Sequence, residues 1–324
     1  RVSLTDECNF RCTYCMPEEL YGEGYPFLNP ASLLTFEEIG NVVRQLATLG
    51  VEKVKITGGE PLLRPGVHNL VSDLLSIPGI RDVGLITNGF HLAGVAERLR
   101  DAGLSSLPGT AAEILDDPVR EILCPDKITT DEWLDCHAAA HEVGLHSNVT
   151  MMFGAVEHPE SWARHIVRTR DLARATGGFT EFVGLPFVHM ASPIYLQRRS
   201  RRGPTFRETL LIHAIARIAY RGVIDNIQLS WVKIGASAAR QLLRAGCNDL
   251  GGTLMDENIS RAAGASHGQT MDHGAFTDLI APLGRRLVQR NTSYGRVDTP
   301  RGEATGATSV KISPTSGLET VGTA

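Results

Sequence analysis

Short apolar runs alternate with longer amphipathic segments along most of the chain. Eight runs have the length and the flanking turn residues that are typical of strands. They cover residues 1–6, 53–57, 82–87, 105–115, 146–152, 179–186, 226–233 and 248–254. Between the runs, seven segments place apolar residues at helical spacing. These cover residues 36–49, 67–75, 95–102, 131–143, 159–175, 207–220 and 236–245.

The order of these segments predicts the fold class. Strands that alternate with helices pair in parallel and are joined by right-handed crossovers. Eight such units in about 250 residues favour an α/β fold, a closed (β/α)8 barrel of the TIM type, over an open doubly wound sheet. Active sites of such barrels lie at the carboxyl ends of the strands. We therefore expect the chemistry on the loops that follow the strands.

Composition and charge narrow the classes of partner. With 42% hydrophobic and 21% charged residues, the 324-residue chain is typical of a globular protein. The net charge of −4 gives no sign of a nucleic acid partner, and no apolar run approaches the roughly 20 residues that a membrane span needs. Residues 297–324 are rich in Gly, Thr, Ser and Pro, which predicts a flexible, disordered tail. Because residue 1 is arginine, we expect a fragment or a processed product.

Three of the six cysteines, Cys8, Cys12 and Cys15, follow the first strand-like run within eight residues. Three thiolates on one loop can hold three irons of a [4Fe–4S] cluster and leave one iron open. A zinc site would need a fourth ligand, and none lies nearby at a suitable spacing. The pattern therefore predicts an iron–sulfur cluster in a reducing compartment, the cytoplasm. The scattered remaining cysteines are interpreted as small buried apolar residues; they are Cys124, Cys136 and Cys247.

The cysteine loop, CNFRCTYCMP, resembles the signature of the radical S-adenosylmethionine (SAM) superfamily. A second motif of that superfamily, GGEP, follows the second strand-like run; its residues are Gly58, Gly59, Glu60 and Pro61. The resemblance implies two cofactors, a [4Fe–4S] cluster and SAM, which together yield a 5′-deoxyadenosyl radical. It also implies that the GGEP motif holds the amino group of SAM, that the backbone of Tyr14 contacts the adenine, and that Glu113 contacts SAM.

Different parts of the chain resemble two different families within the superfamily. Residues 1–104, with KVKITGGEPLLR, resemble the GTP 3′,8-cyclase of molybdenum cofactor biosynthesis. Residues 102–296, with GGFTEFVGLPFVH and NDLGGTLMDENISRAAG, resemble the 5-amino-6-(D-ribitylamino)uracil–L-tyrosine 4-hydroxyphenyl transferase family of FO (deazaflavin) biosynthesis. We therefore predict an N-terminal part of the barrel at 1–104, a C-terminal part at 105–296 and the tail. A natural fusion, a designed recombinant and an assembly artefact would all give such a join.

The cysteine inventory favours the transferase over the cyclase. The cyclase family holds a second cluster with three more cysteines, whereas the other three cysteines here are scattered and form no CxxC pair. The cyclase's terminal Gly-Gly is also absent. GTP cyclisation remains the alternative function. A third hypothesis is a non-catalytic or misjoined iron–sulfur protein that binds a cluster and nothing more.

Resemblance to the transferase implies a reaction and a set of residues. The radical takes hydrogen from the amine of tyrosine, the Cα–Cβ bond breaks, and the 4-hydroxybenzyl fragment adds to C5 of the diaminouracil. Glu181 and His189, which frame the sixth run, are the candidate catalytic acid–base groups. The expected substrate-binding residues are Asn148, Thr150, Trp231, Lys233 and Asp249. Reduction of the cluster implies an electron donor such as flavodoxin or ferredoxin.

Overall fold

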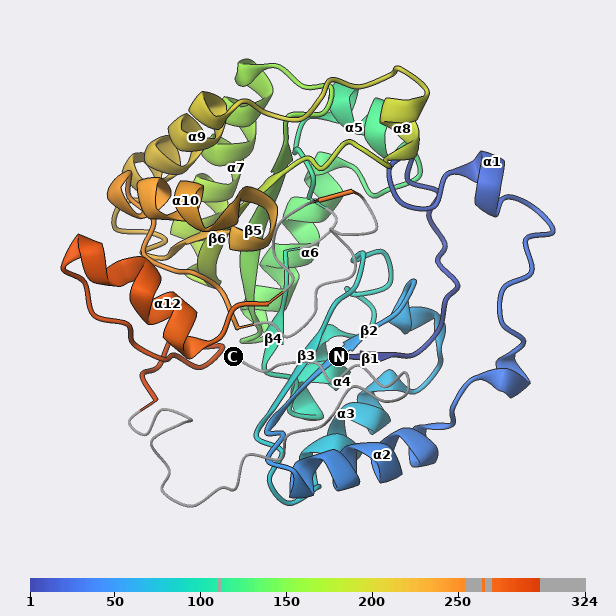
Figure 1. The fold of residues 1–324 in the computed structure, drawn as a ribbon. Helices are drawn as coiled ribbons and strands as arrows, with labels where there is room; N and C mark the ends of the chain where they lie inside the picture. The colour runs from blue at the N-terminus through green and yellow to red at the C-terminus, as the bar shows by residue number, and fades with distance from the viewer. Residues whose placement is uncertain (110–111, 254–263, 266–269, 298–324) are drawn as a thin grey trace.

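The computed structural model describes residues 1–109, 112–253, 264–265 and 270–297. Its centre is a parallel sheet with helices packed around it (Figure 1). The described strands pair in chain order, each parallel to the next. They are β1 (Val2–Ser3), β2 (Lys53–Thr57), β3 (Asp82–Leu85), β4 (Ser106–Leu107), β5 (His146–Phe153), β6 (Phe179–Pro186) and β7 (Ile227–Leu229).

Helices follow most strands, as the alternating pattern predicts. The described α-helices are α1 (Glu18–Tyr21), α2 (Phe36–Thr48), α3 (Val67–Leu75), α4 (Ala96–Asp101), α5 (Asp117–Leu123), α6 (Thr130–Glu142), α7 (Pro159–Thr176), α8 (Pro193–Leu196), α9 (Phe206–Ala219), α10 (Trp231–Arg244) and α12 (His273–Ile280). Short 3-10 turns lie at Pro30–Ser32, Pro61–Leu63 and Ala281–Leu283. Three long helices, α2, α6 and α9, begin with a complete capping box, which satisfies their first backbone N–H groups.

The predicted parallel α/β architecture is confirmed. The described part of the eighth strand-like run forms an isolated bridge in place of a strand. Within residues 248–253, the described part of that run, Asp249 forms an isolated parallel bridge with Gln228 of β7. The fourth run, 105–115, contains only the two strand residues of β4. Among the described residues no pairing joins Asp249 or β7 back to β1. The predicted tail from residue 298 lies outside the described residues.

Two apolar clusters hold the helices against the sheet. One packs β1–β4 against α2, α3 and α4 and includes Ile56 and Leu74. The other packs β5–β7 against α6, α7, α9 and α10 and includes Phe153, Phe182 and Tyr220. All five of these side chains are fully buried. The clusters meet near β4, close to the division predicted at residue 104, which itself remains a prediction.

The three scattered cysteines are buried in these clusters, as predicted. Cys124 follows α5, Cys136 lies within α6, and Cys247 lies between α10 and the bridge at Asp249. None of the described helices is both long and apolar enough to cross a membrane.

Buried histidines link α6 to the start of β5. His137 Nδ1 lies 2.9 Å from Ser147 Oγ, and His141 Nε2 lies 2.7 Å from the same oxygen. His141 Nδ1 lies 2.7 Å from Thr176 Oγ1 at the end of α7. Burial lowers the pKa of His137 to about 3 and that of His141 to about 4. Both rings are therefore neutral at pH 7 and act as hydrogen-bonding parts of the core.

We expect the free energy of unfolding to fall as the pH drops from about 6.5 toward 4. An unfolded histidine has a pKa of about 6.5, so below this pH the unfolded chain binds protons that the folded chain excludes. Urea unfolding at pH 7.5, 6.0 and 5.0 measures the effect. His137→Gln should reduce the slope of the free energy of unfolding against pH, by at most about 1.4 kcal/mol per pH unit for one histidine. An unchanged slope in this variant would contradict the assignment.

Candidate active site

The cysteine loop lies at the carboxyl end of β1. Its three thiols are free; Cys12 is buried, Cys8 half-buried and Cys15 exposed. Burial raises the pKa of Cys12 to about 12, so a bound metal centre would have to displace a proton there. In the described part of the chain, no three Cys, His, Asp or Glu side chains have the spacing of a metal site. The donor chemistry still fits a [4Fe–4S] cluster, because one short loop offers three thiols; their role as ligands remains a prediction.

Two glycines allow the GGEP motif to pack directly on the cysteine loop. A Cβ on Gly59 would lie 2.1 Å from the carbonyl oxygen of Glu7, and one on Gly58 would lie 2.6 Å from that of Thr5. Gly58 also has a φ of 152°, which disfavours other residues. The Gly59 N–H donates to Thr5 O at 2.7 Å, and the Glu60 N–H donates to Glu7 O at 2.8 Å. The motif and the loop are therefore one backbone unit.

The carboxylate of Glu60 is turned into the protein. It is fully buried, and burial raises its pKa although chain donors surround it. Its Oε1 accepts from Thr87 Oγ1 and from the Leu62 N–H, both at 2.8 Å. Its Oε2 accepts from the Asn88 N–H at 2.6 Å. Glu60 thus ties the end of β2 to the end of β3, and the contact of the GGEP motif with SAM remains a prediction.

The structure brings Tyr14 and Glu113 together. Glu113 Oε1 accepts from the Tyr14 hydroxyl. Lys127 Nζ donates to Glu113 Oε1 and to the Tyr14 hydroxyl oxygen, at 2.9 Å in each case. Burial opposes ionisation of Glu113, but Lys127 and the Tyr14 hydroxyl lower the pKa of this carboxyl below its usual value. Glu113 Oε2 is buried without a hydrogen-bond partner among the described residues. No sequence pattern singled out Lys127, because it lies on a loop without periodicity.

A cavity of about 300 Å³ lies inside the sheet. Its wall includes side chains from β2, β4, β5, β6, β7 and the start of α10; they are Lys55, Ser106, Asn148, Glu181, Gln228 and Trp231. Arg290 and Thr292, from the segment after α12, also contribute. Of the residues predicted from the sequence, Asn148, Glu181 and Trp231 therefore line one cavity.

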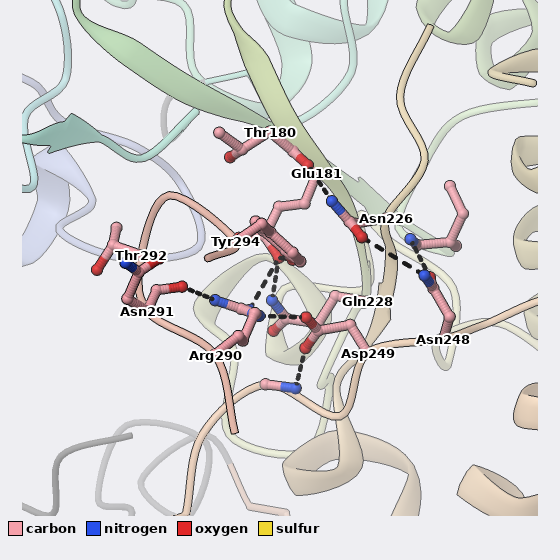
Figure 2. Close-up of polar contacts among 12 residues, drawn as sticks. Thr180, Glu181, Asn226, Gln228, Asn248, Asp249, Arg290, Asn291, Thr292 and Tyr294 are labelled. Carbon is pink, nitrogen blue, oxygen red and sulfur yellow. Dashed lines mark hydrogen bonds and ion pairs between the residues drawn. The ribbon is translucent and has the colours of Figure 1, made fainter. Parts of the chain in front are cut away.

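Glu181 is the centre of a polar network at this cavity (Figure 2). Its Oε1 accepts from Asn148 Nδ2 at 3.0 Å. Its Oε2 accepts from Gln228 Nε2 at 2.5 Å, from the Tyr294 hydroxyl, and from Arg290 Nη2 at 3.4 Å. These donors hold the side chain of Glu181, which is only 8% exposed, in one orientation.

Asp249 belongs to the same network through Arg290. Its Oδ2 accepts from Arg290 Nε at 2.5 Å, and its Oδ1 accepts from the Gly251 N–H at 2.6 Å. Arg290 therefore joins Asp249 to Glu181. The predicted residues Asn148, Glu181 and Asp249 are assembled here, together with three residues that sequence reasoning missed, Gln228, Arg290 and Tyr294.

Residues 290–294 close the amino end of the sheet; we call them the floor segment. The hydroxyl of Thr292 contacts Lys53 and Asp82, the first residues of β2 and β3. The Arg290 guanidinium stacks on the Tyr294 ring, 3.9 Å from its centre. Tyr294 has a φ of 62°, a strained conformation that the surrounding contacts must hold. The floor segment thus supplies Arg290 and Thr292 to the cavity wall and contacts the first residues of β2 and β3.

Other predicted residues lie apart from this network. Glu181 is the third residue of β6, whereas His189 lies three residues beyond the other end of that strand, so the two do not meet. The His189 ring packs against Tyr195 at 4.6 Å. The Thr150 hydroxyl donates to the carbonyl of Gly109. Lys233 lies in the first turn of α10 and is not among the cavity residues.

Trp231 combines packing with a place in the cavity wall. It is 3% exposed, its Nε1 donates to Gly252 O at 3.2 Å, and its ring meets the edge of Phe276. The roles predicted for Trp231 and for the other substrate-binding residues remain predictions.

Gly59→Ala should disrupt the cysteine loop. The added methyl group must displace backbone of the loop, and overpacking of this kind costs about 1–3 kcal/mol. We expect a lower melting temperature and less iron per chain after anaerobic reconstitution. Gly40→Ala is the matched control, because it lies in α2 with nothing within 4 Å of the new methyl group. Equal iron content in the two variants would contradict the backbone packing argument.

Comparison with known families covers almost all of the chain. Residues 2–168 match the radical SAM superfamily, and residues 176–302 match the CofH/MqnC C-terminal region. The floor segment and Glu181 lie in the second of these regions. In solved structures, methylornithine synthase (PylB) shares the fold with a TM-score of 0.62 at 16% identity, over 89% of this chain and 82% of that one. The [FeFe]-hydrogenase maturase HydG shares it with a TM-score of 0.59 at 15% identity, over 76% and 55%.

Curated relatives are more similar in sequence. FO synthase of Nocardia farcinica is 38% identical over 92% of this chain and 35% of its own length. The 5-amino-6-(D-ribitylamino)uracil–L-tyrosine 4-hydroxyphenyl transferases of Methanococcus maripaludis and Methanopyrus kandleri are 35% and 39% identical, over 90% of this chain and 84% and 81% of theirs. This chain thus spans about a third of the length of the FO synthases that it matches.

The match to the transferases extends beyond the segment 102–296 in which the sequence motifs indicated it. Coverage of 90% leaves only about a tenth of the chain unmatched, so most of residues 1–104 is included. The chain therefore belongs to the radical SAM superfamily, in the family that includes the 5-amino-6-(D-ribitylamino)uracil–L-tyrosine 4-hydroxyphenyl transferases.

Proposed function

We propose that this chain transfers the 4-hydroxybenzyl group of tyrosine to 5-amino-6-(D-ribitylamino)uracil. The observation that carries the proposal is the match to two transferases over more than four-fifths of their length. The order of a radical SAM region and a CofH/MqnC C-terminal region along the chain supports it. Relative to the longer FO synthases, the chain would supply this transfer step.

In this proposal Cys8, Cys12 and Cys15 hold the [4Fe–4S] cluster, and the backbone of Gly58–Pro61 receives SAM. Cluster and SAM together supply the 5′-deoxyadenosyl radical. The contact of Gly59 with the loop keeps the two sites in one rigid unit. The unpartnered Oε2 of Glu113 offers a hydrogen-bond acceptor beside Tyr14 on the same side of the sheet.

The substrates would occupy the cavity below. Uracil and ribityl groups present several N–H and O–H donors, and the wall offers carboxylate and amide groups from Glu181, Asn148 and Gln228. Glu181 Oε1 has one chain donor and retains capacity for another. His189, at the carboxyl end of β6, is the candidate for proton transfer nearer the loops.

The proposal includes an electron donor, a flavodoxin or a ferredoxin, because the cluster must be reduced before each reaction. It also places the protein in the cytoplasm, where thiols stay reduced. All six cysteines are free in the structure, in agreement with that environment.

Anaerobic reconstitution tests the function directly. With SAM, dithionite, tyrosine and the diaminouracil, we expect 5′-deoxyadenosine and the coupled product, detected by mass spectrometry. Cys12→Ser should lose the iron–sulfur absorbance and the product, while Cys136→Ser, a change in the core of the fold, should retain both. Deoxyadenosine formed only with GTP would overturn the proposal in favour of the cyclase. A loaded cluster that cleaves SAM in no mixture would indicate the non-catalytic protein.

Glu181→Gln should weaken use of the diaminouracil. The amide cannot accept from all four chain donors, so the cavity wall rearranges and loses a charge-assisted acceptor. Loss of hydrogen bonds to a charged group corresponds to about a 10- to 100-fold fall in kcat/KM. Glu37→Gln, an equal charge change on the exposed face of α2, is the control. Wild-type kinetics in Glu181→Gln would remove this residue from the site.

A further inference from the structure

Lys55 is a half-buried cation inside the sheet that has no partner among the described residues. Along β2, Val54 and Ile56 are buried against the helices, while Lys53 and Lys55 occupy the alternate positions that face the cavity. The residue in register with Lys55 on β3 is Gly84. A Cβ there would lie 3.8 Å from Lys55 Cγ, so the absent side chain leaves room beside the lysine.

Of the other cations that line the cavity, Lys53 and Arg290 are paired, whereas Arg1 is exposed. Lys53 Nζ lies 3.2 Å from Asp82 and also contacts Thr292. Arg290 is bound to Asp249 and Glu181. No hydrogen bond or ion pair joins Lys55 Nζ to any residue in the part of the chain that the structure describes.

The electrostatic surroundings of Lys55 leave its charge uncompensated. Burial, with the nearby cations Lys53 and Arg1, lowers the pKa of Lys55 to about 8. Glu181 acts on it from across the cavity, but both oxygens of that carboxylate already accept chain donors. An unpaired cation that is partly removed from water is costly, and a bound anion would relieve that cost. A negatively charged group is therefore favoured beside Lys55.

We propose that Lys55 binds the carboxylate of the substrate tyrosine. The inference rests on the proposed function, in which tyrosine carries a carboxylate and the ribitylaminouracil carries neither a carboxylate nor a phosphate. Lys55 precedes Gly58 by three strand residues, about 10 Å. A tyrosine held at Lys55 by its carboxylate can thus direct its amine toward the carboxyl end of β2, where the GGEP motif begins.

A comparison of tyrosine with tyramine, which lacks the carboxylate, tests the inference. In reconstituted protein without SAM, calorimetric titration should show that the wild type binds tyrosine more tightly than tyramine. Lys55→Met should weaken tyrosine binding about 10- to 100-fold and leave tyramine binding unchanged. In turnover it should raise the KM for tyrosine and leave the KM for the diaminouracil within about twofold. Lys55→Arg should recover most of the affinity.

Controls separate this role from a structural one. Lys53→Gln should keep the preference for tyrosine, because Lys53 is already paired with Asp82. Lys55→Met should unfold at or above the wild-type temperature, since an unpaired cation is removed; if it fails to fold, Lys55→Gln serves in its place. A Lys55 variant that keeps the full preference for tyrosine over tyramine, while the wild type forms product, overturns this inference alone.

The phosphate groups of a nucleotide are anions as well, so the binding experiment includes GTP as a second ligand. GTP that binds the wild type and loses affinity in Lys55→Met, with no such change for tyrosine, would assign the site to phosphate and overturn the inference. A wild type that forms no product from tyrosine overturns the proposed function itself and removes the premise of this inference.

Discussion

Direct backbone contact between the cysteine loop and the GGEP motif is the constraint on which the candidate site depends. The carbonyls of Thr5 and Glu7 occupy the space that side chains on Gly58 and Gly59 would need. Parallel pairing of β1 with β2 brings these two segments to the same edge of the sheet. Glu60 then fixes that edge to the end of β3 through Thr87 and Asn88. Three loops far apart in sequence thus become one surface.

The two ends of the sheet carry different groups of the candidate site. The Tyr14–Glu113–Lys127 contacts and the cysteine thiols lie toward the carboxyl ends of the strands, whereas Thr292 of the floor segment contacts the first residues of β2 and β3. Between them the cavity wall combines apolar side chains with the polar network of Glu181, which Figure 2 shows. This arrangement suits a reaction whose reactive species is generated above a bound substrate.

Periodicity predicted the elements well where it was strong. The bounds of β2 and β6 agree with the runs at 53–57 and 179–186, because alternating residues end there at glycine, proline or charged positions. The run 105–115 became two strand residues, since Pro108 and Gly109 interrupt it. The contacts of Glu181 could not be predicted, because Arg290 and Tyr294 lie 109 and 113 residues away in an aperiodic segment. The placement of Glu181 near the amino end of β6 followed only from the sheet register.

The contact between Tyr14 and Glu113 joins the two parts of the chain that were predicted to meet at residue 104. Lys127, on the far side of residue 104, completes it, and Thr13 donates to Leu123 O beside it. Residues on the two sides of that point are thus partners and cannot vary independently. Exchange of either part with a relative would have to carry compatible partners for Tyr14. Inheritance of the cysteine loop and of residues 113–127 is therefore coupled, which limits where functional recombination within this family can occur.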